Sequence, residues 1–291
     1  MTAIEIDNLR KQFGKVKAVD GISLEVERGE IYGFLGPNGA GKTTTIRCMM
    51  DFIRPDQGRI YILGMDSRKK AVALKSKIGY LPGVVRLYDK WTGQEHIDFV
   101  QRLKNGGNGA ERLVGYLDFD PGIKARHLSL GNRQKLGLIL ALIGKPEVLF
   151  LDEPTLGLDP LLQSAAYDLL TEANASGTTI FMSSHNLAEV ERICHRVGII
   201  KEGKMVADEG IMKLKKKRMY KVTASFADKF DQNTFAIEGA HIAGKLSDGL
   251  ILDVTGDINP VIRKLGGYEL KDLKIEHASL TDIFMEFYEK R

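Results

Sequence analysis

Gly36-Pro37-Asn38-Gly39-Ala40-Gly41-Lys42-Thr43 follows an apolar run at residues 31–35 and precedes a segment with helical spacing at residues 42–52. The pattern G-x-x-x-x-G-K-[ST] between a strand and a helix is typical of a loop that binds phosphate groups. Its glycines let the backbone curl, so that successive N–H groups can point at phosphate oxygens. The helix that follows adds the positive end of its dipole. The stretch therefore predicts a strand, a phosphate-binding loop and a helix.

Two side chains of the loop carry the chemistry that a nucleotide needs. Lys42 is expected to place its charge on the β- and γ-phosphates, and Thr43 to present its hydroxyl to Mg²⁺. The other residues expected to bind the nucleotide are Asn38, Gly39, Ala40, Gly41 and Thr44. A glycine-rich loop without a ligand is the alternative, and the flanking strand and helix disfavour it.

A second motif lies about 110 residues further along the chain. Val148-Leu149-Phe150-Leu151 is a continuous apolar run, of the kind found in strands buried on both faces, and it ends in Asp152 and Glu153. Because successive side chains of a strand point in opposite directions, the two carboxylates are expected to have different roles. We expect Asp152 to hold Mg²⁺ and Glu153 to polarise an attacking water. Two acids in a polar turn are the alternative, which the phosphate loop disfavours.

The rest of the chain sets the domain organisation. Strand and helix patterns alternate from residue 148 to residue 201, which predicts an α/β domain with a parallel sheet. Beyond residue 212, short alternating strands at residues 220–226 and 250–254 predict a small α+β domain, so the expected domains are 1–212 and 213–291. The two cysteines, Cys48 and Cys194, are expected to be buried thiols in a reducing compartment.

Composition excludes several classes of protein. A chain that is 43% hydrophobic and 27% charged is globular rather than disordered. It has no apolar run of the roughly 18–20 residues that span a bilayer, and no apolar segment of a secretory signal at its start. With 42 basic and 38 acidic residues, no nucleic-acid partner is expected. The basic run at residues 213–218 is interpreted as a solvated linker, with a membrane-surface or nucleic-acid patch as the alternative.

The motifs together resemble the nucleotide-binding domain of ABC transporters over residues 4–210. Leu128-Ser129-Leu130-Gly131-Asn132 resembles the family's signature motif, which is usually written LSGGQ. Asp159 matches the family's D-loop, and His185 matches its switch histidine. Phe13 lies where the family has an aromatic residue that stacks on adenine. Five motifs in the family's order and spacing make this resemblance specific.

The resemblance implies the fold and the activity. The implied fold is a P-loop NTPase of the ABC ATPase type, with a parallel core sheet, an antiparallel β subdomain and a helical subdomain. The implied activity is ATP hydrolysis with ATP and Mg²⁺, in a head-to-tail dimer that holds ATP between the loop of one subunit and the signature of the other. Lys42, Glu153 and His185 would be catalytic, while Ser129, Gly131, Asn132 and Asp159 would contact the nucleotide.

The chain departs from the family pattern at three positions. Leu130 and Asn132 replace Gly and Gln of the signature, although Ser129 and Gly131 are kept. Gly83 stands where the family has Gln, or Glu in exporter relatives, a side chain that contacts Mg²⁺ or its water. A subunit that binds ATP without hydrolysing it is therefore one alternative, against which Glu153 and His185 stand.

The closing segment, Ser279-Leu280-Thr281-Asp282-Ile283-Phe284, resembles that of ATPases serving antibiotic and drug exporters of the bacitracin and daunorubicin type. This implies a motor subunit at the inner face of the cell membrane. It would dock on a separately encoded permease through residues 80–95 and pair with a second ATPase subunit, as a homodimer or a heterodimer. The alternative is a soluble ABC ATPase with a regulatory, nucleic-acid or ribosome-related role. Such relatives carry two ATPase units or a long coiled-coil insertion, neither of which we find in this sequence.

Overall fold

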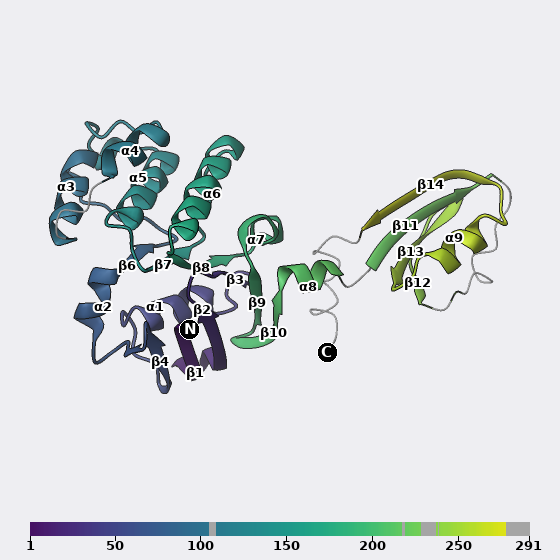
Figure 1. Cartoon of the computed structure of the whole chain (residues 1–291), viewed down its shortest axis with the longest axis horizontal. Coiled ribbons are helices and arrows are strands. Elements are labelled where there is room, and N and C mark those ends of the chain that lie inside the picture. The colour runs from purple at the N-terminus through teal and green to yellow at the C-terminus, as the bar shows by residue number, and fades with distance from the viewer. Residues whose placement is uncertain (105–108, 217–218, 228–236, 238, 278–291) are drawn as a thin grey trace. The chain divides into compact units, whose positions relative to one another are not determined.

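The computed structural model describes residues 1–104, 109–216, 219–227, 237 and 239–277. The chain divides into two compact units, Met1–Glu209 and Gly210–Arg291, which are coloured purple to green and green to yellow in Figure 1. Within the described residues, no helix combines the length and the apolar character needed to cross a membrane.

A six-stranded sheet forms the centre of the first unit. Its order is β10-β9-β3-β8-β7-β6, and the strands from β9 through β3, β8 and β7 to β6 pair in parallel. Every residue of β3, β7 and β8 is buried, which explains the apolar runs at residues 31–35, 148–151 and 180–182. The strands are β3 (Ile31–Leu35), β6 (Ile78–Leu81), β7 (Val148–Asp152), β8 (Thr179–Ser184), β9 (Arg196–Lys201) and β10 (Lys204–Gly210).

The register of this sheet brings the motifs together. Leu35, the last residue of β3, pairs with Ser184 of β8, and Asp152, the last residue of β7, pairs with Ser183 of β8. The three strands therefore end at one edge of the sheet. The segments that follow them contain the glycine-rich loop, Glu153 and His185.

A second sheet of the first unit is antiparallel, in the order β2-β1-β4-β5. Its strands are β1 (Thr2–Phe13), β2 (Val16–Glu27), β4 (Gln57–Ile62) and β5 (Met65–Asp66). Alternate residues such as Ile4, Ile6 and Leu24 are buried, and they share one hydrophobic cluster with Phe34 of β3 and Phe150 of β7. The parallel core sheet and the antiparallel β subdomain that we predicted are both present.

The helices of the first unit are α1 (Lys42–Met49), α2 (Ala71–Lys77), α3 (Gly93–Leu103), α4 (Ala110–Tyr116), α5 (Leu130–Leu142), α6 (Pro160–Ala175) and α7 (Leu187–Ile193), with a 3₁₀ turn at Ala125–His127. α3, α4 and α5 gather on one side of the parallel sheet as the helical subdomain (Figure 1). Thr92 and Glu95 form a capping box that begins α3. The pattern predicts a helix from residue 67, but α2 begins four residues later. There Asp66 accepts hydrogen bonds from the N–H groups of Arg68 and Lys69, which favours a turn.

The second unit contains a four-stranded antiparallel sheet in the order β12-β13-β11-β14. Its elements are α8 (Ile211–Lys216), β11 (Met219–Phe226), β12 (Ala240–Lys245), β13 (Gly249–Thr255), α9 (Asn259–Leu265) and β14 (Leu270–His277). Val222 and Leu252 of the sheet pack with Val261 and Leu265 of α9 in a separate hydrophobic cluster. The exporter-like segment from Ser279 and the side chains of the basic run from residue 214 onward lie outside the described residues.

Candidate functional site

The glycine-rich loop joins β3 to α1. Gly41 has a φ of 112°, and a Cβ atom there would lie 2.3 Å from the carbonyl oxygen of Ala18. A Cβ atom at Gly36 would lie 2.4 Å from the carbonyl oxygen of Ile200. Gly41 precedes α1 without a capping side chain, so N–H groups of the first turn remain available to an anion.

Lys42 is only 6% exposed, and its ammonium group is held inside the loop. Nζ donates hydrogen bonds to the carbonyl oxygens of Gly36, at 2.7 Å, and Pro37, at 3.2 Å. It also lies 3.2 Å from Oε1 of Glu153. That carboxylate oxygen is buried and receives no hydrogen bond from the described residues, so the contact with Lys42 is an ion pair without hydrogen-bond geometry. The loop therefore fixes a positive charge directly beside Glu153.

Thr43 and Asp152 form the second contact between the two motifs. The Thr43 hydroxyl donates to Oδ2 of Asp152 at 2.8 Å, and the Ser183 hydroxyl donates to Oδ1 at 2.6 Å. Asp152 is 3% exposed. One carboxylate and one hydroxyl fit Mg²⁺, which prefers oxygen ligands and completes its shell with phosphates and water. Asp152 also raises the pKa of Tyr80, although burial of the phenol contributes more to that shift.

Glu153 turns away from its neighbour for a reason that differs from our prediction. β7 ends at Asp152, and Glu153 has a φ of 54°, so a left-handed backbone conformation rather than strand alternation sets its direction. Its N–H group donates to the Ser183 hydroxyl at 3.1 Å. Its Oε2 lies 2.7 Å from Nδ1 of His185, which is half exposed after the end of β8. Glu153 thus stands between the Lys42 ammonium and the His185 imidazole.

The residues of the signature-like segment and Asp159 form a second cluster. Ser129 caps α5, with its hydroxyl accepting the Asn132 N–H at 3.2 Å, and Asp159 caps α6, with its carboxylate accepting the Leu162 N–H at 2.9 Å. Leu130 is 65% exposed and packs over Gly157. Among the described residues, no hydrogen bond or ion pair connects Ser129, Gly131, Asn132 or Asp159 with Lys42 or Thr43. One chain therefore holds two separate groups of the expected nucleotide contacts.

Phe13 and Gly83 lie at the edges of the first cluster. Phe13 ends β1 and is 48% exposed, with Nζ of Lys11 located 5.3 Å from its ring centroid. It pairs with Val16 in the β1–β2 hairpin, whose Ala18 contacts the loop at Gly41. A Cβ atom at Gly83 would lie 3.4 Å from Oδ2 of Asp152, so the glycine leaves the side of the carboxylate uncovered.

Several polar residues behind the cluster were missed by the sequence analysis. Ser183 bridges Asp152 and Glu153, and Gln134 of α5 donates to the carbonyl oxygen of Pro154 at 2.9 Å. Glu189 of α7 is buried, and burial raises the pKa of its carboxyl group. The pair Ser183-Ser184 at the end of β8, directly before His185, was a signal that could have indicated Ser183.

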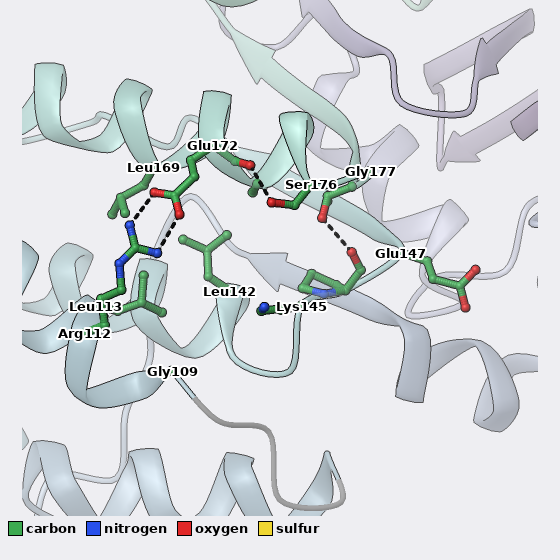
Figure 2. A pocket seen from close by; sticks show the side chains of 13 residues that line it. Gly109, Arg112, Leu113, Leu142, Lys145, Glu147, Leu169, Glu172, Ser176 and Gly177 are labelled. Carbon is green, nitrogen blue, oxygen red and sulfur yellow. Dashed lines mark hydrogen bonds and ion pairs between the residues drawn. The ribbon is translucent and has the colours of Figure 1, made fainter.

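A hollow of about 400 Å³ lies elsewhere in the first unit. Figure 2 shows that it is lined by Leu113, Leu142 and Leu169 and crossed by a bidentate ion pair between Arg112 and Glu172. Glu147 and Thr178, which also line it, precede β7 and β8. The hollow is thus at the opposite ends of these strands from Asp152 and Ser184, and it is not the site described above.

Comparison with known proteins identifies a family and solved structures that this chain resembles. Residues 19–156 match the family model described as ABC transporter. The chain is 37% identical to the bacitracin transport ATP-binding protein BcrA of Bacillus licheniformis, over 98% of this chain and 97% of that protein. It is 32% identical to the daunorubicin resistance ATP-binding protein DrrA3 of Streptomyces coeruleorubidus, over 98% of this chain and 95% of that protein.

A solved structure of an ATP-binding subunit of an ABC transporter superposes on the chain with a TM-score of 0.69. It is 28% identical in sequence and covers 74% of this chain and 92% of its own. The resemblance and the fold class predicted from the motifs are therefore confirmed.

Proposed function

Because the chain belongs to the family of ABC transporter ATP-binding proteins, and is an ATP-binding ATPase of that family, we propose that it is the motor subunit of an exporter. It would work as a dimer docked on a separately encoded membrane permease, at the inner face of the membrane. The observation that carries the proposal is the position of Glu153, 3.2 Å from the Lys42 ammonium and 2.7 Å from His185.

This geometry supports a role for each residue. Lys42 and the free N–H groups at the start of α1 would bind the β- and γ-phosphates. Thr43 and Asp152 would hold Mg²⁺, which neutralises phosphate charge when it is bound. Glu153 would orient a water whose oxygen attacks the γ-phosphorus, while the bond to the β–γ bridging oxygen breaks and ADP leaves. His185, in contact with Glu153, would stabilise the charge of the transferred group.

A dimer is supported by the separation of the two clusters. Ser129, Gly131 and Asp159 lie around the starts of α5 and α6 and make no bond with the loop of their own chain. A helix start with a serine cap is a suitable site for phosphate. Pairing two chains head to tail would bring this cluster of one subunit to the Lys42 loop of the other, so that ATP binds both.

The permease and the direction of transport are supported by two observations. The BcrA and DrrA3 relatives are, by name, a bacitracin transport and a daunorubicin resistance protein, and both match almost the full length of this chain. In addition, the predicted docking segment exposes Val84 and Tyr88, which are 72% and 63% exposed. Tyr88 packs against Trp91 with ring centroids 4.7 Å apart and the two rings tilted by 38°. Exposed aromatic residues of this kind suit a protein interface.

The dimer is tested with Glu153→Gln, which should bind ATP but not hydrolyse it. Light scattering of this variant with ATP and Mg²⁺ should give the mass of two chains, and with ADP the mass of one. The double variant Lys42→Ala/Glu153→Gln is the control and should stay monomeric. A Glu153→Gln protein that stays monomeric with ATP bound would argue against the dimer.

The permease is tested by co-purification. When the tagged chain is expressed in its native host and purified by the tag, a polytopic membrane protein should purify with it. Tyr88→Asp should weaken that association. Purification with ribosomes, and without a membrane protein, would favour the alternative of a soluble ABC ATPase.

A further inference from the structure

Glu189 is a buried carboxyl group that the proposed mechanism does not use. It lies on α7, four residues after His185, and is 4% exposed. Each carboxylate oxygen receives one hydroxyl donor from a different element. Ser184 of β8 donates to Oε2 at 2.5 Å, and Tyr167 of α6 donates to Oε1 at 3.1 Å. Burying a charged group is unfavourable unless it is hydrogen-bonded in this way. We therefore ask what the buried carboxyl group of Glu189 does.

The Ser184 hydroxyl links Glu189 to the turn that contains His185. Its single hydrogen has two acceptors in range, the Glu189 carboxylate at 2.5 Å and the Asn186 carbonyl at 3.1 Å. The carboxylate is both closer and charged, so it takes the hydrogen. The lone pairs of the hydroxyl then face the Asn186 N–H, which donates to it at 2.8 Å. This bond closes a short turn whose central residue is His185.

The Tyr167 hydroxyl links Glu189 to the segment that follows Glu153. Tyr167 lies on α6, the helix that begins after Asp159, and the Arg192 guanidinium lies 4.7 Å from its ring centroid. Thr155, two residues after Glu153, hydrogen-bonds to Tyr167 and lowers its pKa, although burial raises that pKa to about 12. Glu189 is thereby connected to the segments that carry both members of the Glu153–His185 pair.

We propose that Glu189 is a positioning residue for ATP hydrolysis, whose buried carboxylate holds His185 in its orientation toward Glu153 through Ser184 and Tyr167. The inference rests on the proposed roles of Glu153 and His185. It assigns Glu189 no contact with the nucleotide. The charged and titratable groups that affect the pKa of Glu189 are Tyr167, Glu153 and His185. Glu189 in turn raises the pKa of Cys194, although burial contributes more to that shift.

Two variants of the full chain remove the contacts without changing shape. Glu189→Gln turns one acceptor into an NH₂ group that faces a hydroxyl donor, and Tyr167→Phe removes one donor while keeping the ring against Arg192. We expect kcat for ATP hydrolysis to fall about ten- to a hundredfold in Glu189→Gln, with KM unchanged, because misplacing a catalytic group by about 1 Å can cost on the order of a hundredfold. Tyr167→Phe should show a smaller fall.

The ring resonances of His185 provide a readout that a purely structural role would not move. They are assigned with His185→Gln and measured without nucleotide at one pH. We expect them to shift in both variants, while those of His127, on the 3₁₀ turn of the helical subdomain, stay in place. Tyr116→Phe is the matched control, since it removes an exposed tyrosine hydroxyl 3.5 Å from Asp168 of α6. It should change neither readout.

Each outcome decides the proposal. A lower kcat with shifted His185 resonances, in a variant whose melting temperature is no lower than that of the parent, supports it. Unchanged resonances overturn it, whether kcat stays at the parent value or falls only with the amount of folded protein. If the parent chain releases no phosphate from ATP, the proposed function fails, and the resonances still decide whether Glu189 positions His185.

Discussion

The two units of the chain differ in what they bury. In the described part of the first unit, twelve polar or charged residues are buried, among them Lys42, Asp152, Ser183 and Glu189. In the described part of the second unit, every buried residue with a side chain is apolar. Polar groups are costly to bury. Asp152, Ser183 and Ser184 lie at the ends of β7 and β8, where the motifs of the first unit meet.

This difference shows where function constrains the fold. The second unit is explained by folding alone, since alternate residues of β11 and β13 pack on α9. The first unit needs a further reason for an ammonium group surrounded by loop carbonyls and for a buried carboxylate behind His185, the histidine that we propose to be catalytic. If the buried polar groups were dispensable for activity, or if the second unit took part in the chemistry, this difference between the two units would not reflect function.

The largest effect is expected for Lys42→Ala. Its ammonium is the fixed charge of the loop, so we expect loss of ATP binding and a fall in turnover of more than about a thousandfold. Phosphate release and binding of a fluorescent ATP analogue measure the two effects. Lys274→Ala, which removes an exposed lysine of the second unit, is the control and should behave as the parent. Normal ATP binding by Lys42→Ala would contradict the assigned site.

The next effect concerns the second unit. Leu252 of β13 is fully buried in the cluster with α9. Leu252→Ala should therefore destabilise this unit by about 2–5 kcal/mol. Hydrogen exchange of β11 and β13 measures the loss, while kcat for ATP should stay at the parent value. A fall in kcat with unchanged amide protection in the first unit would show that the second unit contributes to hydrolysis.

A smaller effect is expected at the edge of the site. Phe13→Ala should weaken ATP binding by about 1–2 kcal/mol, the order of one base–aromatic stacking contact. Phe13→Trp keeps an aromatic surface and should retain the affinity. Titration calorimetry with an ATP analogue distinguishes the two. Equal affinities of the alanine variant and the parent would mean that adenine binds elsewhere.

The smallest effect concerns the cost of burying Glu189. Burial raises its pKa in the folded protein, so the folded state holds this proton more tightly than the unfolded state does. Its contribution to stability is therefore present at pH values below the unfolded pKa and is lost as pH rises through the folded pKa. Glu189→Gln lacks this loss and should gain stability relative to the parent over that range. Urea unfolding, followed by the fluorescence of Trp91, measures the difference at several pH values, and a constant difference would contradict it.

Local sequence patterns predicted the residues whose spacing is set by a single element or loop. Lys42 and Thr43 follow from the loop pattern, and Asp152 from the apolar strand before it. The direction of Glu153 was predicted for the wrong reason, because its backbone leaves the strand conformation directly after Asp152. Glu189 could not be predicted, since α7 looks like an ordinary amphipathic helix until α6 and β8 pack against it. Such contacts depend on tertiary structure, which no local spacing encodes.

We propose that Glu153, between Lys42 and His185, activates the water that hydrolyses ATP. The most direct test is the rate of phosphate release at saturating ATP and Mg²⁺ by the parent chain and by Glu153→Gln, with ATP binding measured on the same samples. We expect equal binding and a rate about 10²–10⁴ times lower in the variant, the usual contribution of a general base. Hydrolysis by Glu153→Gln at the parent rate would contradict the account.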